Sequence, residues 1–263
     1  MTEDKNSLRL DAVGEQIREP LKLFAEKLIA GLGDNLQSIT VVGSSLTEDF
    51  KPGQSDINTV LVLAKQTLSS LNTIASLAKP IWLRRSASPR RVSKKKISAP
   101  LLMTPSYIER SRDVFAVEFL DFQLNHQTVL GSDPFASLSF DKKDVRLQCE
   151  RELKATLIRL RQGYIASAAN KKLVRDILIS AAKGLAPLLR ALLWLKDIDR
   201  PPRAEPTFRK AASEFSLNMD CLLTAGKWRH EKVRLSESEM ENAFESVYAT
   251  VDQLALTVDK LEV

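Results

Sequence analysis

The sequence predicts an α+β protein, in which an N-terminal sheet with flanking helices is followed by a C-terminal all-α helical bundle. Short β-branched runs at 39–42 and 56–63, separated by turn residues, predict strands in the first half of the chain. Beyond residue 140, apolar residues recur at three- and four-residue spacing, which predicts helices throughout the second half. We therefore expect two domains, 1–140 and 141–263, in a chain of 263 residues.

Composition excludes several other classes of protein. A hydrophobic content of 44% and a charged content of 27% are ordinary globular values, which excludes intrinsic disorder. Two cysteines form no disulfide framework, and the two histidines show no zinc-ligand spacing, so structural zinc is not expected. The sequence shows neither a signal-peptide core nor an uncharged apolar run long enough to span a membrane, and we expect a soluble cytoplasmic protein without a membrane partner. A net charge of +6 permits a polyanionic partner without demonstrating one.

The first element is a helix over 10–28, whose apolar residues follow the helical period. Gly31 and Gly33 are available to end it. Pro20 lies inside this stretch, and it predicts either a kink or two short helices, because proline removes a helical hydrogen bond.

The strand at 39–42 stops at Gly43, and a turn of small residues follows. Gly43 lets the backbone approach a ligand closely, while Ser44 and Ser45 supply hydroxyls and amide donors of the kind that hold phosphate oxygens. After a turn at 52–53, the next strand begins with Asp56 and Asn58. Side chains alternate along a strand, so these two polar residues share one face.

The spacing of these residues resembles a known signature. Gly43 and Ser44, followed after eleven residues by Asp56, Ile57 and Asn58 in an apolar strand, are similar to the core of the DNA polymerase beta-type nucleotidyltransferase superfamily. The resemblance covers only about 38–121, and it implies a mixed sheet. It further implies that carboxylates hold two Mg²⁺ ions, which align a hydroxyl for in-line attack on the α-phosphate of a nucleoside triphosphate. Gly43, Ser44 and Ser45 would hold the phosphate tail.

The sequence departs from the superfamily at Asn58, where a second carboxylate is expected. An amide oxygen can ligate a hard cation but brings no negative charge, so a metal site formed by Asp56 and Asn58 is weakened. The alternative interpretation is that Asp56 and Asn58 only cap a turn that leads into a strand.

A basic segment follows the next predicted helix. That helix covers 68–83, and Pro80 should bend or end it. The segment 84–96 contains seven cations and no acid, and it either binds the phosphates of a nucleotide or nucleic acid or forms a solvated loop. It lacks interleaved aromatic residues, so it provides no stacking platform for single-stranded nucleic acid.

The third carboxylate of the superfamily is expected on a later strand. The stretch 97–103 predicts an edge strand, and Thr104 with Pro105 predicts the start of a short helix. The stretch 114–122 has the composition of a central strand, on which Glu118 and Asp121 face opposite sides. The resemblance makes one of them the remaining catalytic acid. Glu118 is favoured as a metal ligand because strand flanks it on both sides, and Asp121 stays open.

Beyond a turn at 130–135, the period becomes helical. We expect helices over 145–164, 173–196, 206–215 and 219–228, and a last helix whose start is marked by a capping box of Ser236 and Glu239. Arg190 interrupts the apolar run 185–195, and we expect it to extend to the helix surface, with a role in an active cleft as the alternative. The apolar stripe of the last helix can join a bundle within the chain or a second copy in a homodimer.

Two functions remain open from the sequence. One is a metal-dependent nucleotidyltransferase that transfers a nucleoside monophosphate to a hydroxyl of a small molecule, a protein or a nucleic acid. The other is a catalytically degenerate module that binds a nucleotide or a partner for regulation, similar in use to the antitoxin-like members of the superfamily. The retained Gly43, Ser44 and Asp56 favour a ligand site, and Asn58 favours the degenerate module.

Overall fold

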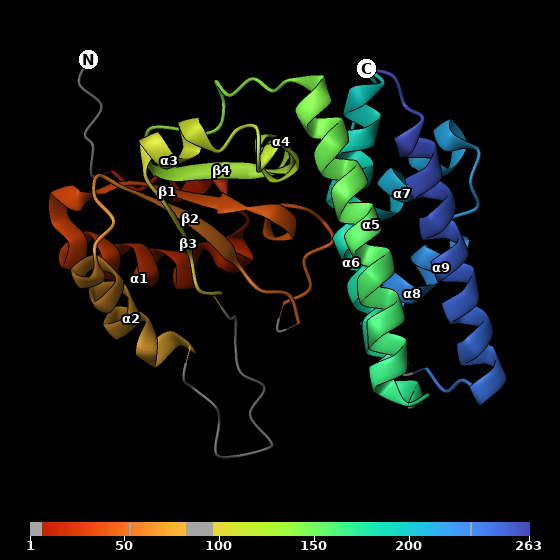
Figure 1. Ribbon diagram of the computed structural model, residues 1–263. Helices are drawn as coiled ribbons and strands as arrows, with labels where there is room; N and C mark the ends of the chain where they lie inside the picture. The colour runs from red at the N-terminus through yellow and green to blue at the C-terminus, as the bar shows by residue number, and fades with distance from the viewer. Residues whose placement is uncertain (1–6, 53, 83–96, 232) are drawn as a thin grey trace. The chain divides into compact units, whose positions relative to one another are not determined.

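A computed structural model describes residues 7–52, 54–82, 97–231 and 233–263. It divides into two compact units (Figure 1). One comprises Met1–Arg112 with Phe122–Ser139, and the other comprises Asp113–Asp121 with Phe140–Val263. The first unit is α+β and the second is helical, so the predicted fold class is confirmed. The helical unit includes Asp113–Asp121, a segment that the sequence analysis assigned to the first domain.

The α+β unit is built on a mixed sheet. The described strands are β1 (Leu36–Val42), β2 (Asn58–Leu63), β3 (Leu101–Met103) and β4 (His126–Gly131), in the order β3-β2-β1-β4. Strand β1 is antiparallel to β2 and β4, whereas β2 and β3 are parallel. The strands expected at 39–42 and 56–63 are confirmed, and β3 lies at the edge of the sheet as expected. Strand β4 was not predicted.

Strand register sorts the side chains between the two faces of the sheet. Thr40 pairs with Val60 on one side and Thr128 on the other, and the two threonine hydroxyls lie 2.9 Å apart. Val42 pairs in the same way with Asn58 and His126. Because directly opposite residues in an antiparallel pair share a face, Asn58, Val42 and His126 form a row across one face. The opposite face is apolar and carries a core with helix α1.

Helices of this unit follow the local signals of the sequence. A 3₁₀ turn (Leu10–Ala12) precedes α1 (Glu15–Leu32), which ends where Gly33 adopts a φ of 50°. Pro20 lies inside α1, so the stretch forms one long helix after a turn and not two short helices. Helix α2 (Leu68–Trp82) continues past Pro80, and Thr104 caps α3 (Pro105–Arg110) with Pro105 in its first turn, as expected. Gly53 and the basic segment 84–96 lie outside the described residues.

The helical unit contains α5 (Lys142–Ser167), α6 (Lys171–Leu195), α7 (Ala204–Phe215), α8 (Asp220–Lys227) and α9 (Glu237–Asp259). Helix α6 packs against α5, α7, α8 and α9 (Figure 1). Among the described helices, α6 is long and apolar enough to cross a membrane, but 56% of its apolar window is buried, which is typical of a core helix. The predicted capping box is present, because Glu239 N–H donates to Ser236 Oγ and Ser236 N–H donates to Glu239 Oε2.

The strand predicted at 114–122 is wrong. This stretch forms helix α4 (Ala116–Leu124), which crosses from the helical unit into the α+β unit. The N–H of Val117, in the first turn of α4, donates to the side-chain oxygen of Gln148 on α5 at 2.8 Å. Gln148 therefore satisfies one of the N–H groups that have no partner within the helix. Glu118 and Asp121 are therefore three residues apart on one helix and are not on opposite faces of a strand.

Candidate functional site

The turn after β1 has the backbone expected of a site where a ligand approaches the main chain closely. Gly43 has a φ of +78°, and it begins a 3₁₀ turn (Gly43–Leu46). Its N–H donates to Asn125 O at 2.8 Å, so this amide is already bonded within the sheet. Ser44 is exposed at the turn, whereas Ser45 is buried. The polar groups that this turn offers to a ligand therefore come from Ser44 more than from Gly43.

The structure places the predicted polar pair beside this turn. Asn58 is exposed at the first position of β2, and a Cβ added to Gly43 would lie 3.9 Å from Asn58 Nδ2. Ile57 is buried and bridges to Ile97, so the exposed Asp56 faces the same side as Asn58. The α+β unit therefore brings Gly43, Ser44, Asp56 and Asn58 to one end of the sheet.

This set of oxygen donors can be tested against the Mg²⁺ that the fold family implies. Within the described ranges, no three His, Cys, Asp or Glu side chains group as a metal site. Asp56 offers one carboxylate and Asn58 offers a neutral amide oxygen. Mg²⁺ is often held by one or two carboxylates together with substrate phosphates. The two residues therefore fit one Mg²⁺ that arrives with a nucleotide, and they do not fit a pair of ions held by protein carboxylates.

Glu118 belongs to the helical unit and is oriented by Gln148. Gln148 is buried, and its Nε2 donates to Glu118 Oε2 at 2.5 Å while its Oε1 accepts the Val117 N–H. Glu118 is nevertheless exposed. Burial raises the pKa of the Cys149 thiol, and the charges of Glu118 and Glu152 raise it further. The two carboxylates therefore lie close enough to this thiol to disfavour its ionised form.

Asp121 pairs with Arg190, a contact that corrects the expectation for that arginine. Arg190 does not extend to the helix surface but is buried, and its Nη1 lies 2.5 Å from Asp121 Oδ1. Arg190 also donates to the carbonyl oxygens of Pro201 and Pro202. Arg200 donates to Leu120 O at 3.2 Å, and burial lowers its pKa. Asp121 is thus the counter-ion of a buried arginine.

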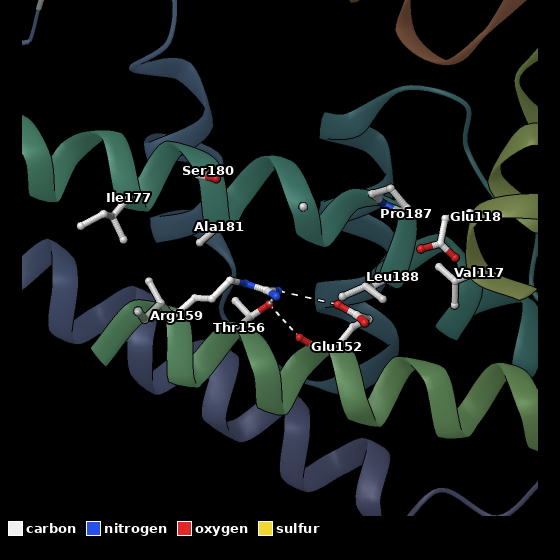
Figure 2. A pocket seen from close by; sticks show the side chains of 12 residues that line it. Val117, Glu118, Glu152, Thr156, Arg159, Ile177, Ser180, Ala181, Pro187 and Leu188 are labelled. Carbon is white, nitrogen blue, oxygen red and sulfur yellow. Dashed lines mark hydrogen bonds and ion pairs between the residues drawn. The ribbon is translucent and has the colours of Figure 1, made fainter. Parts of the chain in front are cut away.

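A pocket of about 470 Å³ opens within the helical unit (Figure 2). Charged residues on α4 and α5 lie at its walls, and small residues of α6 make its hollow. The lining residues are Val117, Glu118, Glu152, Thr156, Arg159, Leu160, Ile177, Ser180, Ala181, Gly184, Pro187 and Leu188.

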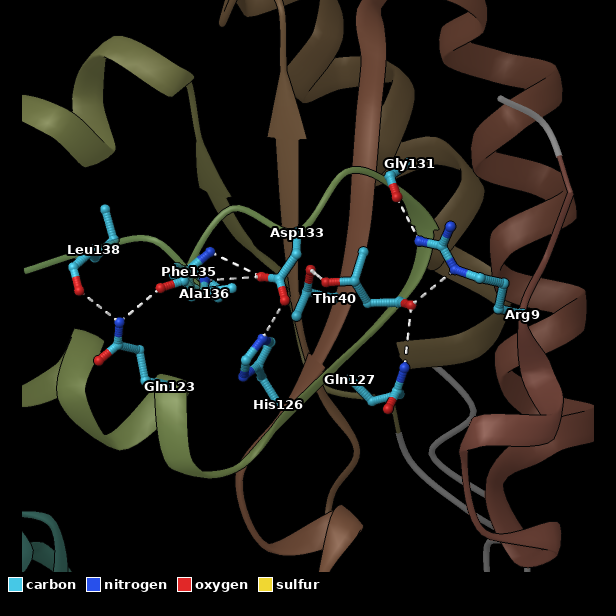
Figure 3. Close-up of polar contacts among 11 residues, drawn as sticks. Arg9, Thr40, Gln123, His126, Gln127, Gly131, Asp133, Phe135, Ala136 and Leu138 are labelled. Atoms are coloured by element: carbon cyan, nitrogen blue, oxygen red, sulfur yellow. Dashed lines mark hydrogen bonds and ion pairs between the residues drawn. The ribbon is translucent and has the colours of Figure 1, made fainter. Parts of the chain in front are cut away.

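Sequence reasoning missed a second polar cluster, which is formed by His126 and Asp133 (Figure 3). The strand register places His126 on the same face of the sheet as Asn58. His126 Nε2 lies 2.7 Å from Asp133 Oδ2, while Asp133 Oδ1 accepts the N–H groups of Phe135 and Ala136. Partial burial alone would raise the pKa of Asp133, but the bonds from Phe135 and His126 outweigh it and lower the pKa. The rarity of histidine and the Asp-Pro turn after β4 were the available signals.

Comparisons with known proteins bear on the whole chain. No protein-family profile matches the sequence, and no curated protein matches it. A solved structure does match: spectinomycin adenyltransferase AAD(9) from Enterococcus faecialis, determined with ATP and spectinomycin. The similarity covers 90% of this chain and 98% of that chain, with a TM-score of 0.58 and 13% sequence identity. The chain has the nucleotidyltransferase fold. At this identity the match establishes the fold alone, and it extends over both units of the protein.

Proposed function

We propose that this protein binds a nucleoside triphosphate at the Gly43 turn and transfers its nucleoside monophosphate to a hydroxyl of a small molecule. One observation carries this proposal. The Gly43 turn lies beside Asn58, at the strand end that Asp56 precedes, in a fold that matches an adenyltransferase over 98% of its length. That neighbour was solved with ATP and with a small molecule, which supports both kinds of ligand for this chain.

The proposed roles follow from the geometry of each residue. The exposed Ser44 contacts the phosphate tail, and Gly43 leaves space for it because no side chain projects there. Asp56 and the amide oxygen of Asn58 would hold the Mg²⁺ that accompanies the nucleotide. When bound, Mg²⁺ neutralises phosphate charge and polarises the reacting phosphoryl group.

The remaining acid is assigned by its partners. Asp121 is committed to Arg190, whereas Glu118 is exposed, lines the pocket of the helical unit and is oriented by Gln148. We assign Glu118 to ligand binding within the helical unit, where an exposed carboxylate can accept a proton. Asp121 stabilises the helical unit as the counter-ion of the buried Arg190.

A second function is favoured by Asn58 itself. With one carboxylate at the strand end, the protein can bind a nucleotide as a regulatory module without transferring it. This degenerate module shares the ligand site of the enzyme and differs in its chemistry. The two functions are therefore separated by measuring binding and turnover independently.

The test combines calorimetry and mass spectrometry on the full chain. We expect the wild type to bind ATP in the presence of Mg²⁺, and Asp56→Ala to lose most of that affinity. The exposed Asp34 is a matched control, so Asp34→Ala should bind as the wild type does. Mass spectrometry then asks whether spectinomycin, a small molecule bound by the structural neighbour, gains an AMP group.

Asn58→Asp distinguishes the two functions. Adding a carboxylate beside a divalent cation should tighten Mg²⁺-dependent ATP binding by about tenfold, because a neutral ligand becomes an anion at nearly unchanged size. Turnover that begins only in Asn58→Asp supports the regulatory module, whereas turnover in the wild type supports the enzyme. If neither protein binds ATP, the Gly43 turn is only a strand connection and both functions are refuted.

A further inference from the structure

We propose that the protein forms a two-fold symmetric dimer through its helical unit, in which helix α5 of one copy packs against helix α9 of the second copy. The interface consists of two stripes of side chains, one basic on α5 and one acidic on α9. The inference concerns the assembly of the protein and does not rest on the proposed nucleotide site.

Helix α5 exposes a stripe of cations and aliphatic side chains. Its buried side, which includes Cys149 and Leu153, belongs to the core of the helical unit. The exposed stripe contains no acid, and its members follow the alternating four- and three-residue spacing of helix–helix interfaces: Leu147, Arg151, Lys154, Ile158, Arg161 and Ile165. Leu147, Ile158 and Ile165 are 59%, 48% and 77% exposed. Three exposed aliphatic residues that share one stripe indicate a face that packs against another protein.

Helix α9 carries the complementary charge. The helix contains glutamates and aspartates but no lysine or arginine. The stripe that it turns toward solvent combines acids with one leucine: Glu241, Glu245, Asp252, Leu256 and Asp259. Leu256 is 54% exposed. The two helices therefore present stripes of similar construction and opposite charge.

The two stripes adjoin on one side of the helical unit. Helices α5 and α9 are in contact (Figure 1) and antiparallel. The ring centroids of Tyr164, near the end of α5, and Phe244, near the start of α9, lie 4.4 Å apart. Lys154 Nζ lies 3.2 Å from Asp259 Oδ1, and these two residues are members of the two stripes. The basic and acidic stripes are therefore the two halves of one face.

Such a face is complementary to itself in one of two symmetric arrangements. A two-fold axis perpendicular to the helices places α5 on α5 and α9 on α9, so that like charges meet. An axis parallel to the helices places each α5 on the α9 of the second copy, so that opposite charges meet in both contacts. This axis also preserves the level of a residue along the helices. Arg161 is three residues before Tyr164 and Glu245 is one residue after Phe244, so Arg161 lies within one helical turn of Glu245 of the second copy.

The size and charge of the face favour a second copy as the partner. Helix α9 has 23 residues, so the face is about 35 Å long, and two helices side by side make it about 20 Å wide. It can bury about 700 Å² on each copy, close to the roughly 800 Å² of a standard specific interface. A nucleic acid or an anionic membrane would be attracted by the cations of α5 but repelled by the adjacent acids of α9.

The test measures self-association of the full chain by sedimentation velocity over a range of concentrations. We expect a monomer–dimer equilibrium that weakens in high salt, because exposed charges are screened. Arg161→Glu and Glu245→Arg should each weaken dimerisation by about tenfold or more, since each variant brings like charges together in both symmetric contacts. The control is Arg209→Glu, which changes an exposed arginine on α7, outside the two stripes, and should associate as the wild type does.

Mixing the two variants tests the arrangement of the dimer. In a mixed dimer of Arg161→Glu with Glu245→Arg, each contact between α5 and α9 again joins opposite charges, so the mixture should dimerise as the wild type does. Charges that act only within one chain cannot produce this rescue. The double variant, with both substitutions in one chain, should also dimerise, whereas an interface of α5 on α5 would still bring like charges together. Failure of the mixture and of the double variant to dimerise overturns the inference.

An aliphatic pair tests the location of the interface. Ile158 and Leu173 are both 48% exposed, and Leu173 lies on α6, outside the two stripes. Ile158→Glu should abolish dimerisation, and Leu173→Glu should preserve it, with circular dichroism to establish that both variants fold. A wild type that stays monomeric in low salt, or a folded Ile158→Glu that still dimerises, overturns the inference. Binding of a monomeric wild type to anionic lipid vesicles would assign the α5 stripe to a membrane and likewise overturn it.

Discussion

Replacing Asp121 by alanine should destabilise the helical unit severely. The side chains of Arg190 and Asp121 are only 9% and 14% exposed, so Asp121→Ala leaves a guanidinium buried with the carbonyls of Pro201 and Pro202 as its remaining partners. Breaking a buried ion pair by removing one partner typically lowers the free energy of unfolding by about 3–5 kcal/mol. Because those two carbonyls stay bonded, we expect the lower part of this range, about 3 kcal/mol.

A double-mutant cycle isolates the pair. Arg190→Met combined with Asp121→Ala removes both charges and retains an apolar side chain, and it should destabilise the unit less than Asp121→Ala alone. Urea unfolding followed by fluorescence is suitable, since Trp194 and Trp228 both lie in the helical unit. The exposed pair of Glu205 and Arg209 is the control, and Glu205→Ala should leave stability close to that of the wild type.

The same variant decides the role of Asp121. If Asp121→Ala changes the free energy of unfolding by less than about 1 kcal/mol, the buried-pair reasoning is refuted. If in addition Mg²⁺-dependent ATP binding is lost, Asp121 takes part in nucleotide binding and is not only a counter-ion. If stability falls and the folded fraction still binds ATP, Asp121 is the counter-ion described above.

Two further predictions concern the α+β unit. Gly131→Ala should lower stability by about 3 kcal/mol or more, because Gly131 has a φ of +72° and its added Cβ would lie 1.9 Å from Gln37 O. At Gly33, whose φ is +50°, the added Cβ meets open space, so Gly33→Ala should lower stability less than Gly131→Ala does; thermal unfolding of both variants checks this. The free energy of unfolding, measured as the pH is lowered, should show a contribution from Asp133, whose folded pKa lies below its unfolded value. This contribution is complete above the unfolded pKa, falls as the pH drops toward the folded pKa, and is missing in Asp133→Asn. Parallel curves of stability against pH for the two proteins would contradict this prediction.

Local signals in the sequence predicted much of the fold. The β-branched run at 39–42, the cap formed by Thr104 before Pro105, and the capping box of Ser236 and Glu239 each act within a few residues, and the structure contains all three. Interactions of this kind are encoded in adjacent residues, so a single sequence reveals them.

The errors arose where distant residues decide the structure. The apolar and aromatic residues at 114–122 suit a strand, yet a side chain of α5, Gln148, satisfies the first turn of a helix there. Arg190 was expected at the surface because its partner, Asp121, is 69 residues away in the sequence. Strand β4 was missed because it depends on pairing with β1, and its polar residues His126 and Gln127 weaken the strand pattern. The residues of each stretch do not by themselves reveal these distant partners.

The pairing of one carboxylate, Asp56, with one amide, Asn58, constrains how the proposed site can work. With Asp121 paired to Arg190 and Glu118 held by Gln148 in the other unit, Asp56 supplies the negative charge that the α+β unit offers beside Asn58. One carboxylate and one amide hold a hydrated Mg²⁺ weakly, whereas nucleotide phosphates add several further oxygens and more charge. Metal affinity should therefore depend on the nucleotide, so that the two bind as a complex. Under the proposed function, such a site binds a nucleotide as a regulatory ligand or reacts with it, and Asn58→Asp tests which of the two it does.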